Sequence, residues 1–159
     1  MSKPILVVVA LAAAAALVAP LASAPAATSS SFTLLSRLDT RSMAGVDTRP
    51  KGRSAGDTFV FSTWLSRDGK PDGRGEFAQT LVDNRYQGIS IQGDLLLADG
   101  TLALQAAGLN GRPPGGPRPV DQSDYAIVGG TGAYAGARGT VHPVTVGRTT
   151  ERLEVQITG

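Results

Sequence analysis

The sequence of 159 residues contains no cysteine and one histidine, His142. Without cysteine the chain has no disulfide, no thiolate ligand for a metal and no cysteine nucleophile. A single histidine also argues against a metal site, because protein metal sites that use nitrogen or sulfur draw on several such residues. We therefore expect no metal, and a fold that side-chain packing and backbone pairing stabilise.

The sequence also lacks a run of charges of one sign. Its 15 lysines and arginines are scattered among 13 aspartates and glutamates. Proteins that bind nucleic acid gather their basic residues into a patch or stripe. We therefore expect no nucleic-acid partner.

The one long hydrophobic run lies near Met1. Lys3 precedes an alanine-rich apolar stretch from Ile5 to Leu21, and the sequence Ala-Pro-Ala at 24–26 then matches a signal-peptidase site. This arrangement predicts a secretory signal peptide over residues 1–26 and a secreted, extracellular protein that does not associate with a membrane after cleavage. A retained membrane anchor is the alternative, because the run is about as long as a short membrane span.

Cleavage after residue 26 leaves 133 of the 159 residues, enough for one domain. We expect a flexible leader over residues 27–31 and a single domain over residues 32–159. No segment of that domain has a helical period. Segments with the two-residue alternation of a strand cover residues 31–39, 57–65, 76–83, 86–98, 101–107, 141–146 and 151–158. Residues 40–56, 66–75 and 110–124 are rich in glycine, proline and other turn residues, which predicts loops. The fold class is all-β, and an up-and-down barrel is favoured over a sandwich.

The strand at 57–65 carries most of the aromatic side chains. Its alternation places Phe59, Phe61 and Thr63 on one face and Val60 and Trp64 on the other. Apolar residues on both faces are typical of a barrel strand with one face toward the lumen and the other against a neighbour. The returning strand at 76–83 can present Phe77 to the same lumen.

A glycine-rich segment at 125–141, YAIVGGTGAYAGARGTV, predicts a strand, a tight turn and a second strand. Its GGTG is similar to dinucleotide-binding loops, but Gly136 comes one residue too late for GxGxxG, and the 20 residues after Gly139 are too few for the βαβ unit. We interpret the glycines as structural, for positive φ and close strand approach. They are Gly129, Gly130, Gly132, Gly136 and Gly139.

This segment resembles the closing hairpin of the dirigent and allene oxide cyclase family, in which an apolar strand, GGTG or GGSG, an aromatic residue and ARG follow one another. Further similarities are Gly56-Asp57 before the aromatic strand, the turn at 68–75 and GISIQG at 88–93. They occur in the order found in actinobacterial secreted proteins of this kind. The resemblance implies an eight-stranded antiparallel up-and-down barrel.

The resemblance also implies a function. Members hold an apolar small molecule in the lumen and steer its cyclisation or stereoselective coupling by positioning, without a cofactor, and relatives form trimers. If this chain is an enzyme, it is expected to be a cofactor-independent isomerase or cyclase. Phe59, Phe61, Thr63 and Phe77 are the predicted ligand-binding residues.

The catalytic residues of the plant cyclases do not carry over, because Ser36, Thr63 and Phe77 stand where those enzymes have a glutamate, an asparagine and a cysteine. Asp39 and Arg138 are the remaining catalytic candidates. Each also has a structural interpretation, Asp39 as an exposed strand end and Arg138 as an ion-pair partner that holds the hairpin.

Two other functions stay open. A non-catalytic carrier similar to a lipocalin needs the same lumen but no convergent polar groups. An interaction module would use its outer face and have a lumen filled with side chains. The volume of the lumen and the polar atoms that reach it distinguish these alternatives.

Overall fold

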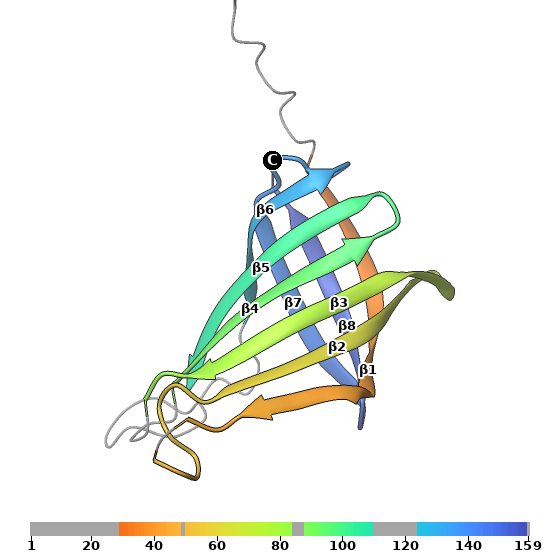
Figure 1. Ribbon diagram of the computed structural model, residues 1–159. Helices are drawn as coiled ribbons and strands as arrows, with labels where there is room; N and C mark the ends of the chain where they lie inside the picture. The colour runs from red at the N-terminus through yellow and green to blue at the C-terminus, as the bar shows by residue number, and fades with distance from the viewer. Residues whose placement is uncertain (1–28, 49, 84–87, 110–123, 159) are drawn as a thin grey trace, which may run out of the picture.

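The computed structural model describes residues 29–48, 50–83, 88–109 and 124–158, and these residues form one closed antiparallel barrel (Figure 1). The eight strands are β1 (Ser30–Val46), β2 (Thr58–Arg67), β3 (Lys70–Leu81), β4 (Gly88–Leu97), β5 (Gly100–Leu109), β6 (Tyr125–Gly132), β7 (Gly139–Gly147) and β8 (Thr150–Ile157). The predicted all-β, eight-stranded up-and-down barrel is therefore confirmed. The predicted signal peptide, residues 27–28 of the leader, residues 86–87 and loop residues 110–123 lie outside the described residues, while the last two leader residues belong to β1.

The barrel closes because β1 pairs with both β2 and β8. Leu35 is the partner of Ser66 on one side and of Arg152 on the other. Closure leaves no sheet edge exposed, which is how a small β-protein without disulfides avoids pairing with other chains.

β1 is longer than its sequence indicates, since it was expected to end at Asp39 and runs on to Val46. A bulge between Asp39 and Ala44 interrupts its register with β2. There the side chain of Ser42 replaces a backbone partner: its Oγ accepts a hydrogen bond from the Ser62 N–H at 2.8 Å and donates to the Asp39 carbonyl at 2.7 Å. The strand bends at this point (Figure 1), as bulged strands do.

The predicted turn at 66–75 is also wrong in extent. Only Asp68 and Gly69 form the turn, and Asp68 has a φ of 51°, the left-handed conformation that aspartate tolerates. β3 begins at Lys70 and contains the glycines that were assigned to the loop.

The inward-facing side chains divide the lumen along its length. Residues with almost no exposed surface fill one part: Leu34, Leu95, Leu102 and Val155. Arg67 covers that end, with its guanidinium 4.2 Å from the centre of the Phe32 ring, an ion pair to Asp72 at 2.9 Å and a hydrogen bond to the Tyr134 hydroxyl at 2.9 Å. The other part of the lumen is not filled.

Candidate functional site

A cavity of about 330 Å³ occupies the unfilled part of the lumen. On β2 the side chains of Phe59, Phe61 and Thr63 form its wall. The next inward-facing residue, Leu65, is buried in the packed part of the lumen. Met43, Gln79, Thr145 and Arg148 also border it. A cavity of this size falls at the lower end of the range for small-molecule sites, about 300 to 1,000 Å³.

Four aromatic rings form a continuous chain in this wall. Phe61 stacks on Phe77 with the ring centres 5.2 Å apart and an interplanar angle of 17°. Phe59 lies 5.9 Å from Phe61, and Tyr125 lies 6.0 Å from Phe77. These separations lie within the range for favourable ring contacts, so the cavity presents extended flat apolar surface.

Glycines on the neighbouring strands make room for these rings. A Cβ at Gly75 would lie 2.5 Å from the Thr63 hydroxyl oxygen and 2.8 Å from the Phe77 ring. The Phe77 ring also occupies the space beside Gly93, its partner on β4. Side chains at either position would push the ring into the cavity, so the glycines help to keep the cavity open.

Polar side chains lie together on β8, β1 and β2, which are adjacent strands. Ser36 pairs directly with Glu151, and Thr63 pairs with Leu38, two residues further along β1. Ser36 and Thr63 are buried, with 4% and 6% of their surface exposed. All three polar residues border the cavity, so it has a polar wall as well as an aromatic one.

Two ionisable groups in the cavity are perturbed by their surroundings. Burial raises the pKa of Glu151 above its ordinary value. Burial, and then the charge of Glu151, raises the pKa of Tyr125 to about 12. A carboxyl with a raised pKa holds its proton more readily than one in water, and a tyrosine with a pKa this high stays a hydrogen-bond donor.

The structure brings the four predicted ligand-binding residues together. Phe59, Phe61, Thr63 and Phe77 all border the one cavity. No ligand is present, so their role in binding stays a prediction.

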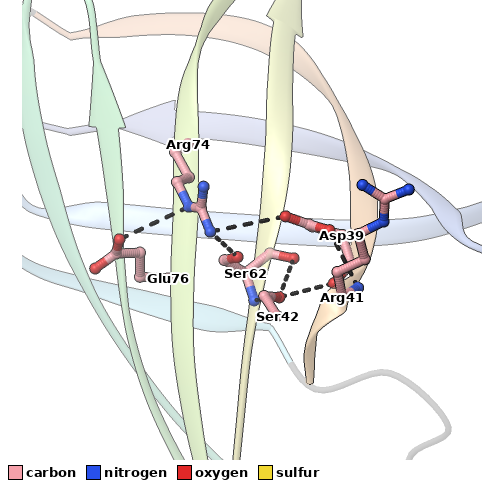
Figure 2. A network of polar contacts seen from close by, with 6 residues as sticks. All are labelled: Asp39, Arg41, Ser42, Ser62, Arg74 and Glu76. Carbon is pink, nitrogen blue, oxygen red and sulfur yellow. Dashed lines mark hydrogen bonds and ion pairs between the residues drawn. The ribbon is translucent and has the colours of Figure 1, made fainter. Parts of the chain in front are cut away.

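Neither predicted catalytic candidate reaches this cavity. Asp39 lies on the outer face, where Figure 2 shows it beside Arg74 and Ser62, and its carboxylate is 3.8 Å from the Arg74 guanidinium. The bulge after Asp39 and the outward phase of the strand place it there. Arg138 is exposed, and its guanidinium donates a hydrogen bond to the carbonyl of Ala137 at 2.8 Å, in the turn after β6.

The glycine motif has a different layout from the predicted tight hairpin. β6 pairs with β7 only through Tyr125, Ala126 and Ile127, and the glycines that follow pair with β5 instead. Gly132, Gly136 and Gly139 have positive φ angles of 61°, 77° and 144°. Gly130 lies against the carbonyl of Thr101, whereas Gly129 has neither a positive φ nor an atom within 4 Å of a Cβ.

The sequence analysis predicted neither Glu151 nor Tyr125 as a site residue. The signal for Glu151 is present, because Leu153, Val155 and Ile157 alternate inward and the same phase extended by two residues puts Glu151 in the lumen. Among the described residues there is no group of three or more histidines, cysteines or acids that could hold a metal. The described part of the chain also has no helix that is long and apolar enough to cross a membrane.

Comparison with solved structures finds the same barrel in enzymes and dirigent proteins. A pyocyanin demethylase superposes with a TM-score of 0.64 and 25% identity, over 81% of this chain and all of that protein. This chain shares the barrel fold of that protein. A pterocarpan synthase dirigent protein matches with a TM-score of 0.54 and 21% identity, over 82% of this chain and 84% of that protein.

AbnU, an exo-specific intermolecular Diels-Alderase, matches with a TM-score of 0.56 and 10% identity, over 83% of this chain and 99% of that protein. At these identities the likeness to the dirigent protein and the Diels-Alderase concerns the fold. No family model matches the sequence. No curated protein matches it either.

Proposed function

We propose that this dirigent-type barrel binds a flat, largely apolar small molecule in its lumen and steers a cyclisation or stereoselective coupling of it. The observation that carries the proposal is the cavity bordered by the chain of aromatic rings from Phe59 to Tyr125. The barrels of similar structure include a Diels-Alderase, a pterocarpan synthase and a demethylase that acts on pyocyanin, all proteins named for small-molecule chemistry.

Positioning supplies most of the proposed effect. Holding a reactive molecule in one conformer between rigid walls can lower a barrier by several kcal/mol, without a nucleophile or a metal. Tyr125 offers a hydroxyl that keeps its proton, and Glu151 offers a carboxyl whose pKa is raised by burial, so that it holds a proton more readily than a carboxyl in water. These two groups can stabilise charge that develops on the bound molecule as bonds rearrange.

The polar wall favours an enzyme over a simple carrier. A carrier requires an apolar lumen alone, whereas here Thr63, Tyr125 and Glu151 reach the same cavity as the aromatic rings. Glu151 is half-buried, which costs stability, and carboxyls with pKa values perturbed in this way cluster at functional sites. An interaction module with a filled lumen is disfavoured by the cavity itself.

The binding part of the proposal is tested with naphthalene as an apolar probe, measured by isothermal titration calorimetry. Loss of the Phe61 ring in the Phe61→Ala variant removes about 1.5 to 3 kcal/mol of contact, so affinity is expected to fall roughly 10- to 100-fold. Val60→Ala is the matched control, because Val60 is the preceding residue of β2, faces outward and is 40% exposed. Equal affinities for both variants would contradict a lumen site.

The catalytic part is tested on the natural ligand. Small molecules that co-purify with the protein are identified by mass spectrometry and incubated with wild type and with Glu151→Gln. Conversion by wild type that falls in the variant, with binding retained, supports steering assisted by Glu151. Tight binding with no conversion by either protein supports the carrier.

Two further proposals concern location and assembly. We propose that residues 1–26 are removed on export and that the barrel acts outside the cell. We also propose self-association through the outer face of β1 to β4, on which Trp64 is 55% exposed, Leu35 46%, Leu96 41% and Val60 40%. Exposed apolar side chains gathered on one face are typical of a protein–protein contact.

A further inference from the structure

The contact between β6 and β7, which we call the β6–β7 seam, is short and lies beside the cavity. In the described part of the chain only three residues of β6, Tyr125 to Ile127, pair with β7, whereas β8 pairs with β7 through eight residues. The first of the three is Tyr125, whose partner is Val141, and both residues border the cavity. A contact with few backbone hydrogen bonds opens at a lower cost than one with many. Opening of the seam would therefore give access to the lumen between Tyr125 and Val141.

A pair of charged side chains closes this seam one position before Tyr125. The Nδ1 atom of His142 lies within ion-pair distance of the Asp124 carboxylate. The two residues extend the antiparallel register of Tyr125 and Val141 by one position on each strand. Their side chains are 49% and 58% exposed, as expected for neighbours of inward-facing residues. The ion pair thus holds the two strands together from outside, next to the residues that border the cavity.

The charge of His142 determines how strongly this pair holds. Two acidic residues lie beside it, Asp124 at the start of β6 and Glu154, its partner on β8. Glu154 already forms an ion pair with Arg152 at 3.0 Å, whereas His142 is the one ion-pair partner of Asp124 among the described residues. Histidine is the side chain that ordinarily gains or loses its charge between pH 5 and pH 8. Loss of the charge leaves at most a hydrogen bond to Asp124, so the pair weakens as the pH rises.

We propose that His142 is a positioning residue for the lumen: its ion pair with Asp124 holds Tyr125 in the cavity wall, and loss of its charge frees the seam through which small molecules enter and leave. This inference rests on the proposed function, since it assigns a route and a pH dependence to molecules bound in the same cavity. Entry and release are slow at acidic pH and faster above neutral pH. Because ion pairs between exposed groups are weak, the expected change in rate is roughly two- to fivefold.

The first experiment measures the release rate of naphthalene by stopped-flow fluorescence. Wild type should release naphthalene roughly two- to fivefold faster at pH 7.5 than at pH 5.5. His142→Gln should release it at the faster rate at both pH values, because glutamine can form a hydrogen bond but carries no charge. Glu151→Gln is the control for the other acidic group at the cavity. The ratio of its two rates should equal that of wild type.

A disulfide across the seam tests the route independently of pH. The chain has no cysteine, so Asp124→Cys combined with His142→Cys can form a single disulfide, and facing positions on paired strands have the Cα separation that a disulfide needs. Oxidation prevents the seam from opening and should slow release at least about tenfold, and reduction should reverse the effect. Ser31→Cys combined with Gln156→Cys is the matched control, because these residues are partners on β1 and β8. Its oxidation should leave the release rate unchanged.

Three results overturn the inference. The first is a wild-type release rate that does not change with pH, and the second is a pH response that persists in His142→Gln. The third is equal release by the oxidised and reduced forms of the Asp124→Cys, His142→Cys variant, which shows that molecules leave by another route. In all three naphthalene still binds in the lumen and the proposed function stands, whereas failure of wild type to bind naphthalene overturns both.

Discussion

Gly132 is a position at which a single methyl group should damage the fold. It ends β6 with a φ of 61°, and a Cβ there would lie 2.6 Å from the carbonyl oxygen of Asp99 and 2.9 Å from the Cα of Gly100. The Asp99 carbonyl accepts a hydrogen bond from the Ala133 N–H at 2.9 Å. Moving the carbonyl to admit a methyl group would therefore also disturb the turn.

The cost of Gly132→Ala can be assembled from these contacts. A non-glycine residue in the left-handed region costs about 1 to 2 kcal/mol, and forcing backbone apart costs about 1 to 3 kcal/mol. The lower entropy of the unfolded alanine chain offsets about 0.4 to 1 kcal/mol. The net loss of roughly 2 to 4 kcal/mol is a large part of the 5 to 15 kcal/mol that stabilises a typical domain.

Thermal and urea unfolding measure the effect. We expect the Tm of Gly132→Ala to fall by roughly 6 to 15 °C. Gly129→Ala is the matched control from the same motif, because Gly129 has no positive φ and a Cβ there would meet no atom within 4 Å. Its stability should change by less than about 1 kcal/mol. If the two variants unfold together, Gly132 does not occupy a left-handed turn and the layout of β6 is wrong.

Three further predictions follow from the lumen, the outer face and the N-terminal segment. Because burial raises the pKa of Glu151, the folded carboxyl holds its proton at pH values where the unfolded chain has lost it, and the free energy of unfolding falls as pH rises. The stability advantage of Glu151→Gln over wild type should thus grow as the pH rises above about 4, and an advantage that is independent of pH would refute the partial burial of Glu151. Sedimentation at micromolar concentration should show an oligomer for wild type and a shift to monomer for Trp64→Ser, whereas a wild-type monomer at all concentrations contradicts the proposed outer contact. N-terminal sequencing of the culture supernatant should begin at Ala27 or within a few residues of it, and an intact Met1 in a membrane fraction would contradict export.

The aromatic wall could be predicted because its cause is local. Successive side chains of a strand alternate between the two faces, so the order Phe59, Phe61, Thr63 in one unbroken strand already places these residues together. The hairpin to β3 then brings Phe77 opposite Phe61. The sequence shows this alternation because β2 itself runs without a bulge from Phe59 to Leu65.

The positions of Asp39 and Glu151 depend on contacts between strands that are far apart in the sequence. At Ser42 a side chain takes the place of a backbone hydrogen-bond partner, so the two-residue alternation is lost and the sequence does not show that β1 continues. For the same reason the ion pair between Asp39 and Arg74 on the outer face could not be predicted. The inward phase of Glu151 is readable in β8. Its burial depends on closure, because Ser36 from the far end of the chain is its partner.

The division of the lumen explains how a small barrel without disulfides can keep unfavourable groups inside it. Leu34, Leu95 and Val155 are almost fully buried in the packed part, and each buried side chain of this kind contributes about 1.5 to 3 kcal/mol. That stability offsets the unpaired hydroxyl of Thr63 and the half-buried carboxyl of Glu151, which both weaken the free protein. Replacing both by apolar residues of similar shape should therefore raise stability and abolish selective binding together. Such a trade-off between stability and binding is expected wherever a protein holds polar groups ready for a ligand. It indicates that the barrel needs its polar wall for function and not for folding.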